Sequence, residues 1–346
     1  MKSVINRIKC YIPIKAKKTA TPIRWGIIGT GNMAEVFGRT IDHSTDGIIE
    51  AVASRTKTKA EKYAKKHFNC KAYDTYEALV NDSKIDIIYI ATPVKQHYDN
   101  IKMCLLNKKN VICEKPLVEN LEQMLELKNL AKKNNCFFME GMWMKCLPTY
   151  QTALKWIRDG RIGDIDLIKV DFYKHELINT NLTIFDKNNA GGVLNDYGIY
   201  AIAFPLGFIE GDIEVQGDCR MSKYEIDTDW QINMKTNKEK IFINISSDFE
   251  GTSRAALIGK EGSIVWEPQF NRTNKLLLYN AEGVQMESFV ANYSDQGFEY
   301  EVSEVHKCLR KGLKESVLVT LSSTENALKI KDNLYKLDMK KFKIKN

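Results

Sequence analysis

The chain has 346 residues, enough for two domains of ordinary size. Apolar residues make up 44% of it and charged residues 27%, which excludes a disordered or low-complexity protein. The net charge of +7 is concentrated at the ends, where residues 1–22 carry six basic side chains and residues 339–346 carry four lysines. The rest has 41 basic and 44 acidic residues, so the folded body lacks the basic surface of a nucleic-acid-binding protein.

We interpret residues 1–21 and 339–346 as basic tails. The first lacks the apolar core and the cleavage site of a signal peptide, and its contact with a membrane surface is a secondary interpretation. Eight cysteines occur without paired spacing, which indicates a reducing cytoplasm rather than a disulfide framework. No apolar run approaches the roughly 18 residues of a membrane span. The cysteines and the five histidines show no metal-ligand spacing, so no metal is expected.

Short apolar runs alternate with segments of helical periodicity from residue 23 onward. Crossovers of this length between strands predict a parallel sheet covered on both faces. We therefore expect an α/β doubly wound, dinucleotide-binding (Rossmann) domain over residues 22–145. Its predicted strands are 23–28, 48–53, 86–91, 110–113 and 136–140, and its predicted helices are 33–41, 57–67, 96–106 and 121–133.

The character of the sequence changes after residue 145. Strand candidates separated by turn signals predict a largely antiparallel sheet. Residues 146–338 are therefore expected to form an α+β domain for substrate binding and dimerisation. Its predicted strands are 165–173, 214–219, 231–235, 240–246, 253–258, 276–279 and 286–289, and its predicted helices are 150–158, 192–208, 298–311 and 322–337.

A glycine-rich turn joins the first predicted strand to the first helix. Its G-x-G-x-x-A pattern runs from Gly29 through Gly31 to Ala34. The first glycine permits a tight turn, the second lets a pyrophosphate approach the backbone, and the small third residue lets the helix pack against the strand. An ordinary βα turn is the alternative, but the strand–loop–helix–strand context favours NAD(P). The candidate cofactor residues in this turn are Gly29, Gly31, Asn32, Met33 and Ala34.

The end of the second predicted strand indicates which dinucleotide is bound. NAD-specific Rossmann domains place an acidic residue there, on the ribose. This chain instead has Ser54 and Arg55, with Lys59 one helical turn later. These residue types suit a 2′-phosphate, so we predict NADP rather than NAD. The alternative is a solvated helix start with ordinary surface cations.

Two further motifs carry polar groups suited to chemistry. Glu114 and Lys115 follow a predicted parallel strand, at the edge where doubly wound sheets bind ligands. Asp196 and Tyr200, four residues apart, share one face of a predicted helix. Each motif has a structural alternative when it is taken alone, namely a surface lysine before a proline turn, and a helix-dipole acid beside a half-buried tyrosine.

Together these motifs resemble the glucose-fructose oxidoreductase / inositol dehydrogenase / rhizopine catabolism (Gfo/Idh/MocA) family of NAD(P)-dependent oxidoreductases. The resemblance covers about residues 22 to 338 and includes the order of the motifs. Within the family, the sequence is similar to the dimeric dihydrodiol dehydrogenase and D-xylose dehydrogenase branch. The segments that carry this likeness are 91–93, 96–97, 114–116, 139–143, 190–200 and 308–316.

The resemblance implies hydride transfer between the nicotinamide and a carbinol carbon. Tyr200 would be the general acid/base, because it stands where much of the family has histidine, and Lys115 beside it would favour the tyrosinate. Asp196 would position the substrate hydroxyl or the lysine. The resemblance also implies further cofactor and substrate contacts. The cofactor contacts are Thr92, Pro93, His97 and Glu114, and the substrate contacts are Trp143 and Lys145. For His97, a structural role is the alternative.

The expected substrate is a small polyol or sugar, including cyclitols and dihydrodiols. The loop 175–189 lacks the basic residue that the branch often carries, and Thr183 stands near that position. Two alternatives stay open: a nucleotide-sugar oxidoreductase of surface-polysaccharide synthesis, and a non-catalytic NADP-sensing regulator. We also expect a homodimer, formed through the face of the antiparallel sheet that no helix is left to cover.

Overall fold

A computed structural model describes residues 21–43, 46–67, 69–176, 183–293 and 296–338. They form two compact units. The parallel-sheet unit comprises residues 21–143 and 293–321, and the eight-stranded unit comprises residues 144–292 and 322–338. No helix within the described ranges is long and apolar enough to cross a membrane.

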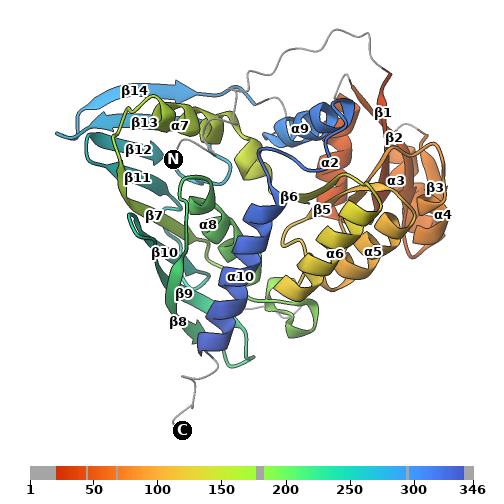
Figure 1. Ribbon diagram of the computed structural model, residues 1–346. Helices are drawn as coiled ribbons and strands as arrows, with labels where there is room; N and C mark the ends of the chain where they lie inside the picture. The colour runs from red at the N-terminus through yellow and green to blue at the C-terminus, as the bar shows by residue number, and fades with distance from the viewer. Residues whose placement is uncertain (1–20, 44–45, 68, 177–182, 294–295, 339–346) are drawn as a thin grey trace. The chain divides into compact units, whose positions relative to one another are not determined.

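The parallel-sheet unit has the predicted doubly wound architecture (Figure 1). Its six parallel strands follow the order β3-β2-β1-β4-β5-β6, which reverses direction between β1 and β4. The strands are β1 (Ile23–Ile28), β2 (Gly47–Ala53), β3 (Lys71–Tyr73), β4 (Ile87–Ile90), β5 (Asn110–Glu114) and β6 (Phe138–Gly141). The helices are α2 (Asn32–His43), α3 (Lys57–Lys66), α4 (Tyr76–Val80), α5 (His97–Leu106) and α6 (Leu121–Lys133).

Helix α9 (Phe298–Arg310) packs in the parallel-sheet unit, although we expected residues 146–338 to form one domain (Figure 1). Trp25 Nε1 on β1 lies 3.0 Å from His306 Nε2 on α9. Arg310 at the end of α9 forms an ion pair of 2.8 Å with Asp46. The polypeptide therefore returns to the first sheet after completing the second.

Helix α9 also brings a carboxyl group into the core beside the carboxyl ends of β5 and β6. Glu301 is fully buried, and neither of its oxygens has a hydrogen-bond partner. Burial raises the pKa of Glu301 well above its ordinary value, and the nearby Glu114 and Glu140 raise it further. Glu114 is better satisfied, because it accepts a hydrogen bond of 2.5 Å from the Tyr89 hydroxyl. Burial and the two neighbouring carboxyl groups thus drive Glu301 to the neutral form.

The eight-stranded unit follows the order β14-β13-β12-β11-β7-β10-β9-β8. Only the central pair β7–β10 of this described sheet is parallel. The expected fold class is therefore confirmed. The strands are β7 (Ile165–Tyr173), β8 (Glu214–Met221), β9 (Asp227–Lys235), β10 (Lys240–Ser246), β11 (Ala255–Gly259), β12 (Gly262–Trp266), β13 (Lys275–Asn280) and β14 (Gln285–Val290). The helices are α7 (Pro148–Arg158), α8 (Ile199–Ala203) and α10 (Leu321–Asp338).

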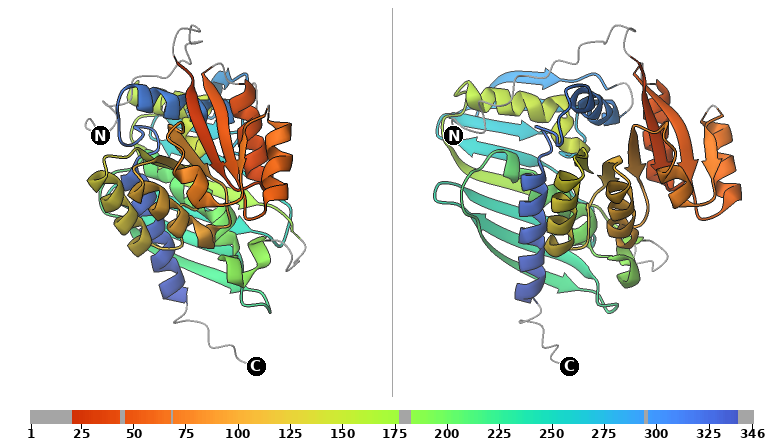
Figure 2. Two further views of the ribbon diagram at one scale, coloured as in Figure 1. Left: turned by 90° about the vertical axis from the view of Figure 1, so that its right-hand side faces the viewer. Right: turned by 45° about the vertical axis from the view of Figure 1, so that its right-hand side comes forward.

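Alternate residues of this sheet have different surroundings. On β10, Ile241, Ile243 and Ile245 are buried, whereas the intervening Phe242 is 41% exposed. Figure 2 shows α7 and α10 along one face of the sheet. The Phe242 face continues through Val265 on β12, which is only half-buried. One face thus forms the core of the unit, and the other carries Phe242 and Val265 among polar side chains such as Lys169.

The predicted helix 192–208 differs from the structure. A π-helical turn occupies Leu194–Gly198, α8 follows it, and Pro205–Gly207 form a 3₁₀ turn. The apolar periodicity of this segment did not distinguish these three geometries. The wider backbone turn lies in the motif that carries Asp196, and such π turns occur frequently at functional sites.

Replacing Glu301 with glutamine should stabilise the protein increasingly as the pH rises. The folded state keeps Glu301 protonated, whereas the unfolded chain ionises it above its ordinary pKa, so wild-type folding becomes less favourable with pH by at most about 1.4 kcal/mol per unit. Below that ordinary pKa both states are protonated and the difference vanishes. Urea unfolding of Glu301→Gln and wild type should agree near pH 4 and diverge near pH 8.

The matched control is Glu61→Gln, on the exposed side of α3. It should show no such divergence. An advantage of Glu301→Gln that is the same at both pH values would contradict a neutral buried carboxyl group.

Candidate functional site

The glycine turn after β1 has the geometry that its sequence predicts. Gly29 has a φ of +109°, and a Cβ there would lie 2.6 Å from the carbonyl oxygen of Ala91. A Cβ at Gly31 would meet nothing within 4 Å, so the backbone is open to a ligand there. Ala34 is fully buried at the start of α2, whose first turn faces this opening. Asn32 is exposed and Met33 half-buried beside it.

The end of β2 lies against this turn. The hydroxyl oxygens of Ser54 and Thr30 are 3.3 Å apart. Ser54 is buried, while Arg55 and Lys59 are exposed at the start of α3. The structure thus brings the glycine turn and the predicted 2′-phosphate residues together at the carboxyl edge of the sheet.

The loops after β4 and β5 meet at the same edge. His97 joins them: its Nε2 lies 2.7 Å from the carbonyl oxygen of Thr92, and its Nδ1 lies 3.1 Å from that of Pro116. Pro116 follows Lys115 through a cis peptide bond. Burial lowers the pKa of His97, and the charge of Lys115 lowers it further. Both ring nitrogens of His97 therefore face the backbone, which favours the structural role over direct cofactor contact.

Lys115 stands where β5 ends, half-buried, and Pro93 is exposed after β4. The backbone N–H of Lys115 donates to Glu114 Oε2 at 3.3 Å. Burial raises the pKa of Glu114, against the opposing effects of its hydrogen bond from Tyr89 and the charge of Lys115. Glu114 is thus a buried acceptor beneath Lys115 rather than an exposed ligand.

Two predicted substrate residues have partners within their own units. The Trp143 ring stacks on Phe298 with ring centroids 4.2 Å apart and an interplanar angle of 4°. The buried Lys145 donates a hydrogen bond to the Ser323 hydroxyl at the start of α10. Phe298 could not be predicted from the sequence, because 155 positions separate it from the tryptophan that it supports.

Asp196 and Tyr200 lie in the eight-stranded unit, on the π turn and on α8. The backbone N–H of Asp196 donates to the carbonyl oxygen of Gly192 at 3.2 Å. The Tyr200 ring is stacked near Phe172 of β7, with centroids 6.5 Å apart. On the same side, the Tyr197 hydroxyl donates to Glu176 at 2.9 Å. An aromatic layer over β7 thus supports the segment that carries both predicted groups.

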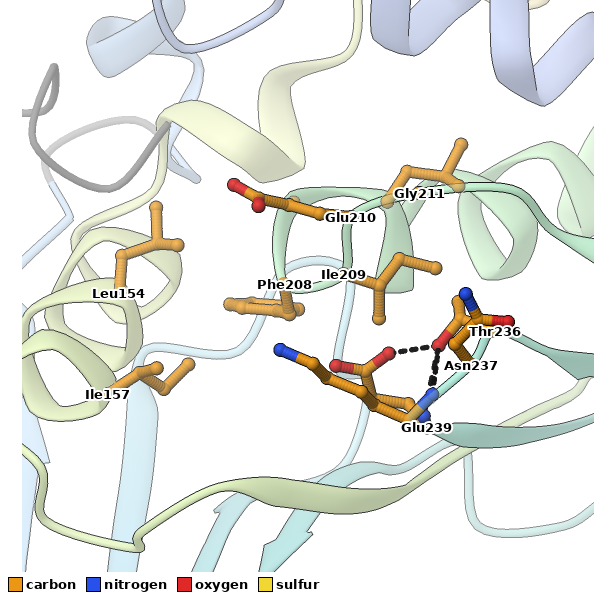
Figure 3. Close-up of a pocket in the computed structure, with 12 residues that line it drawn as sticks. Leu154, Ile157, Phe208, Ile209, Glu210, Gly211, Thr236, Asn237 and Glu239 are labelled. Carbon is orange, nitrogen blue, oxygen red and sulfur yellow. Dashed lines mark hydrogen bonds between the residues drawn. The ribbon is translucent and has the colours of Figure 1, made fainter. Parts of the chain in front are cut away.

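A hollow of about 280 Å³ lies elsewhere in the eight-stranded unit, between α7 and the β9–β10 turn (Figure 3). Phe208 and Ile209 line it with apolar surface, and Thr236 and Glu239 lie at its rim. These two polar residues bond to each other, since the Thr236 hydroxyl accepts from the Glu239 backbone N–H and donates to the Glu239 carboxylate. None of the predicted site residues lines this hollow.

Comparison with known proteins agrees with this geometry. Residues 23–142 match the model of an oxidoreductase family with an NAD-binding Rossmann fold, and residues 150–265 match the GFO/IDH/MocA C-terminal domain. The trans-1,2-dihydrobenzene-1,2-diol dehydrogenase of Xenopus laevis is 31% identical, over 89% of this chain and 96% of its own length. The human enzyme of the same name is 29% identical, over 88% and 93%.

Solved structures share the fold. A levoglucosan dehydrogenase in complex with NADH and levoglucosan superposes with a TM-score of 0.84 at 17% identity, covering 93% of this chain and 98% of its own. A 3-ketoreductase from Actinomadura kijaniata, in complex with NADP and TDP-benzene, gives 0.82 at 19% identity, covering 92% and 98%. The predicted family, the nicotinamide cofactor and the enzyme class are thereby confirmed. The chain belongs to the GFO/IDH/MocA family of NAD(P)-dependent oxidoreductases.

Proposed function

We propose that this protein transfers a hydride between the nicotinamide of NADP and a carbinol carbon of a sugar, cyclitol or dihydrodiol. The observation that carries the proposal is the common edge at which the glycine turn, Ser54 and Lys115 lie, after β1, β2 and β5. The relatives named dihydrodiol dehydrogenases, which align over almost the whole chain, support the substrate class. The bound nicotinamide would supply or accept the hydride.

The protein's own groups would handle the proton. In oxidation, Tyr200 as tyrosinate would accept the proton of the substrate hydroxyl as the carbon loses its hydride. In reduction, the phenol would return that proton to the carbonyl oxygen. Lys115 would stabilise the tyrosinate by its charge, and Asp196 would orient the hydroxyl. Trp143 and Lys145 would contribute to substrate binding, and Glu114 and His97 would hold the loops that present Lys115 and Thr92.

We also propose that Arg55, Ser54 and Lys59 select NADP over NAD. Arg55 is exposed at the end of β2 and has no ion-pair partner among the described residues, so its guanidinium is available to a 2′-phosphate. The absence of a carboxylate at Ser54 removes the acceptor that would favour the NAD ribose.

A second copy of the chain is the proposed partner. Phe242, Val265 and Leu167 lie on the face of the eight-stranded sheet opposite the buried core, and Phe242 is 41% exposed. Burying this face against its copy would remove the apolar surface from water.

We place the enzyme in the cytoplasm, because the seven described cysteines are all free.

Lys115→Met and Tyr200→Phe should each lower kcat by about 10² to 10⁴-fold, because each removes a group needed for proton transfer. Affinity for NADP should stay within a few-fold of wild type. Turnover is measured with NADP⁺ and a panel of aldoses, cyclitols, dihydrodiols and nucleotide sugars, and affinity by fluorescence titration. Activity confined to nucleotide sugars would support the alternative substrate class.

The exposed side chains Lys132 and Tyr224 provide matched controls. Lys132→Met and Tyr224→Phe should turn over at the wild-type rate. Near-normal turnover of Lys115→Met and Tyr200→Phe would refute the proposed acid/base pair.

Wild type should prefer NADP over NAD by at least about tenfold in kcat/KM, since a charge-assisted hydrogen bond to the phosphate contributes about 1.5 to 3 kcal/mol. Arg55→Ala should remove most of this preference. Ser54→Asp should reverse it, because a carboxylate repels the phosphate and accepts hydrogen bonds from the ribose. The control is Lys62→Ala, exposed on α3. An Arg55→Ala enzyme with unchanged preference would disprove the assignment.

Phe242→Glu should convert the proposed dimer to monomer, because a charge would be buried in the apolar contact. Light scattering coupled to gel filtration at micromolar concentration distinguishes the two states. Leu125→Glu, which changes an exposed apolar residue of α6, should stay dimeric. A monomeric wild type would show that the open sheet face has another role.

A further inference from the structure

A buried carboxylate from β9 lies against the turn that carries Asp196. Asp227 is 2% exposed, and its Oδ2 accepts hydrogen bonds from the backbone N–H of Leu194 at 2.8 Å and from Trp230 Nε1 at 2.9 Å. Its Oδ1 accepts from the Tyr335 hydroxyl at 3.3 Å. Three donors from three different segments thus converge on one side chain.

The donors determine which oxygen can carry a proton. A backbone N–H and an indole N–H can only donate, so Oδ2 must be an acceptor. Burial raises the pKa of Asp227, and its hydrogen bonds oppose that rise. Any proton would have to sit on Oδ1, facing the Tyr335 oxygen. The contact to Leu194 is therefore kept in either protonation state.

Asp227 acts on the turn as a cap supplied from a distant strand. The π turn Leu194–Gly198 has no capping hydrogen bond from Val193 at its own N-terminus. The Asp227 carboxylate, 33 positions later in the sequence, binds the first N–H of the turn instead. A negative group there also complements the partial positive charge of a helix N-terminus.

The glycine before the turn fits this arrangement. Gly192 has a φ of +123°, and a Cβ built there would lie 2.1 Å from Asp227 Oδ1. The close approach of the carboxylate is therefore possible only without a side chain at position 192. The lack of a side chain at Gly192 thus makes room for Asp227.

Helix α10 holds the turn from a second direction. Lys331 is 1% exposed, and its Nζ donates to Asn195 Oδ1 at 3.0 Å. Asn195 Nδ2 in turn donates to the carbonyl oxygen of Ala190 at 3.0 Å. Lys331 and Tyr335 are four residues apart and thus share one face of α10. One helix therefore contacts both the turn and the carboxylate that caps it.

We propose that Asp227 is a positioning residue of the reaction. It holds the π turn in the conformation that orients Asp196 and Tyr200 for catalysis, and Lys331 supports the same turn. This inference rests on the proposed catalytic role of Tyr200. Asp227 does not touch the substrate. Its contribution is the position of the backbone on which the acid/base group stands.

The test compares Asp227→Ala with Asp227→Asn. Alanine leaves the N–H groups of Leu194 and Trp230 without an acceptor, and the resulting shift of the turn should lower kcat by about ten- to a hundredfold. Asparagine can place its oxygen at the Oδ2 position and its NH₂ toward the Tyr335 oxygen, so kcat should recover to within about threefold. Both variants should bind NADP like wild type by fluorescence titration, because the glycine turn belongs to the other unit.

Leu257→Ala separates positioning from loss of stability. It truncates a fully buried side chain of β11, a strand that carries neither Asp227 nor the π turn, and should lower Tm at least as much as Asp227→Ala. Its kcat, measured well below Tm, should be that of wild type. A folded Asp227→Ala enzyme with wild-type kcat would overturn the proposal, and so would equal losses for alanine and asparagine.

Lys331→Met tests the same support of the π turn if Asp227→Ala does not fold. It should lower kcat by about fivefold or more, whereas Lys329→Met, exposed on the same helix, should not. Wild-type kcat for Lys331→Met would then refute the inference. Tyr200→Phe is assayed in parallel. If Tyr200→Phe stays active, the proposed function fails. If Tyr200→Phe is inactive and Asp227→Ala has wild-type kcat, only the positioning role is overturned.

Discussion

Parallel strands direct all their carboxyl ends to one edge of a sheet, and the candidate site depends on this constraint. Gly29 and Lys115 are 86 positions apart, yet both stand at that edge, after β1 and β5. His97 holds the loops after β4 and β5 together there, because its two ring nitrogens lie within hydrogen-bonding distance of the carbonyl oxygens of Thr92 and Pro116. Since the sheet fixes where each loop begins, short segments suffice to present the groups that bind and react.

The buried carboxyl groups of this protein differ in whether they accept hydrogen bonds. Asp227 and Glu114 accept hydrogen bonds from donors that the fold supplies, and each lies under a segment with a proposed function. Glu301 has no partner, and its burial beside two other carboxyl groups drives it to the neutral form. Hydrogen bonding, rather than burial itself, thus decides whether a buried acid can act as an anchor.

Much of the fold could be predicted from the sequence, because apolar periodicity and turn residues are local signals. The strands Ile23–Ile28 and Ile165–Tyr173 and the helix Leu121–Lys133 have the predicted bounds. Strand β12, with Ser263 between buried neighbours, was not predicted, because it begins with glycine and serine and leaves an apolar run of only Ile264 to Trp266. The packing of α9 in the parallel-sheet unit was not predicted either. It depends on Trp25 meeting His306, a contact that no local pattern shows.

The motifs were found because their residues are adjacent in the chain, whereas the residues that support them come from elsewhere. Asp227 follows Leu194 by 33 positions, and Tyr335 follows Asp227 by 108. Gly192 nevertheless indicates this partner in the sequence, because its lack of a Cβ is what admits the Asp227 carboxylate. A motif glycine with positive φ can therefore mark an unseen neighbour as well as a turn. Its environment must be known before its role is assigned.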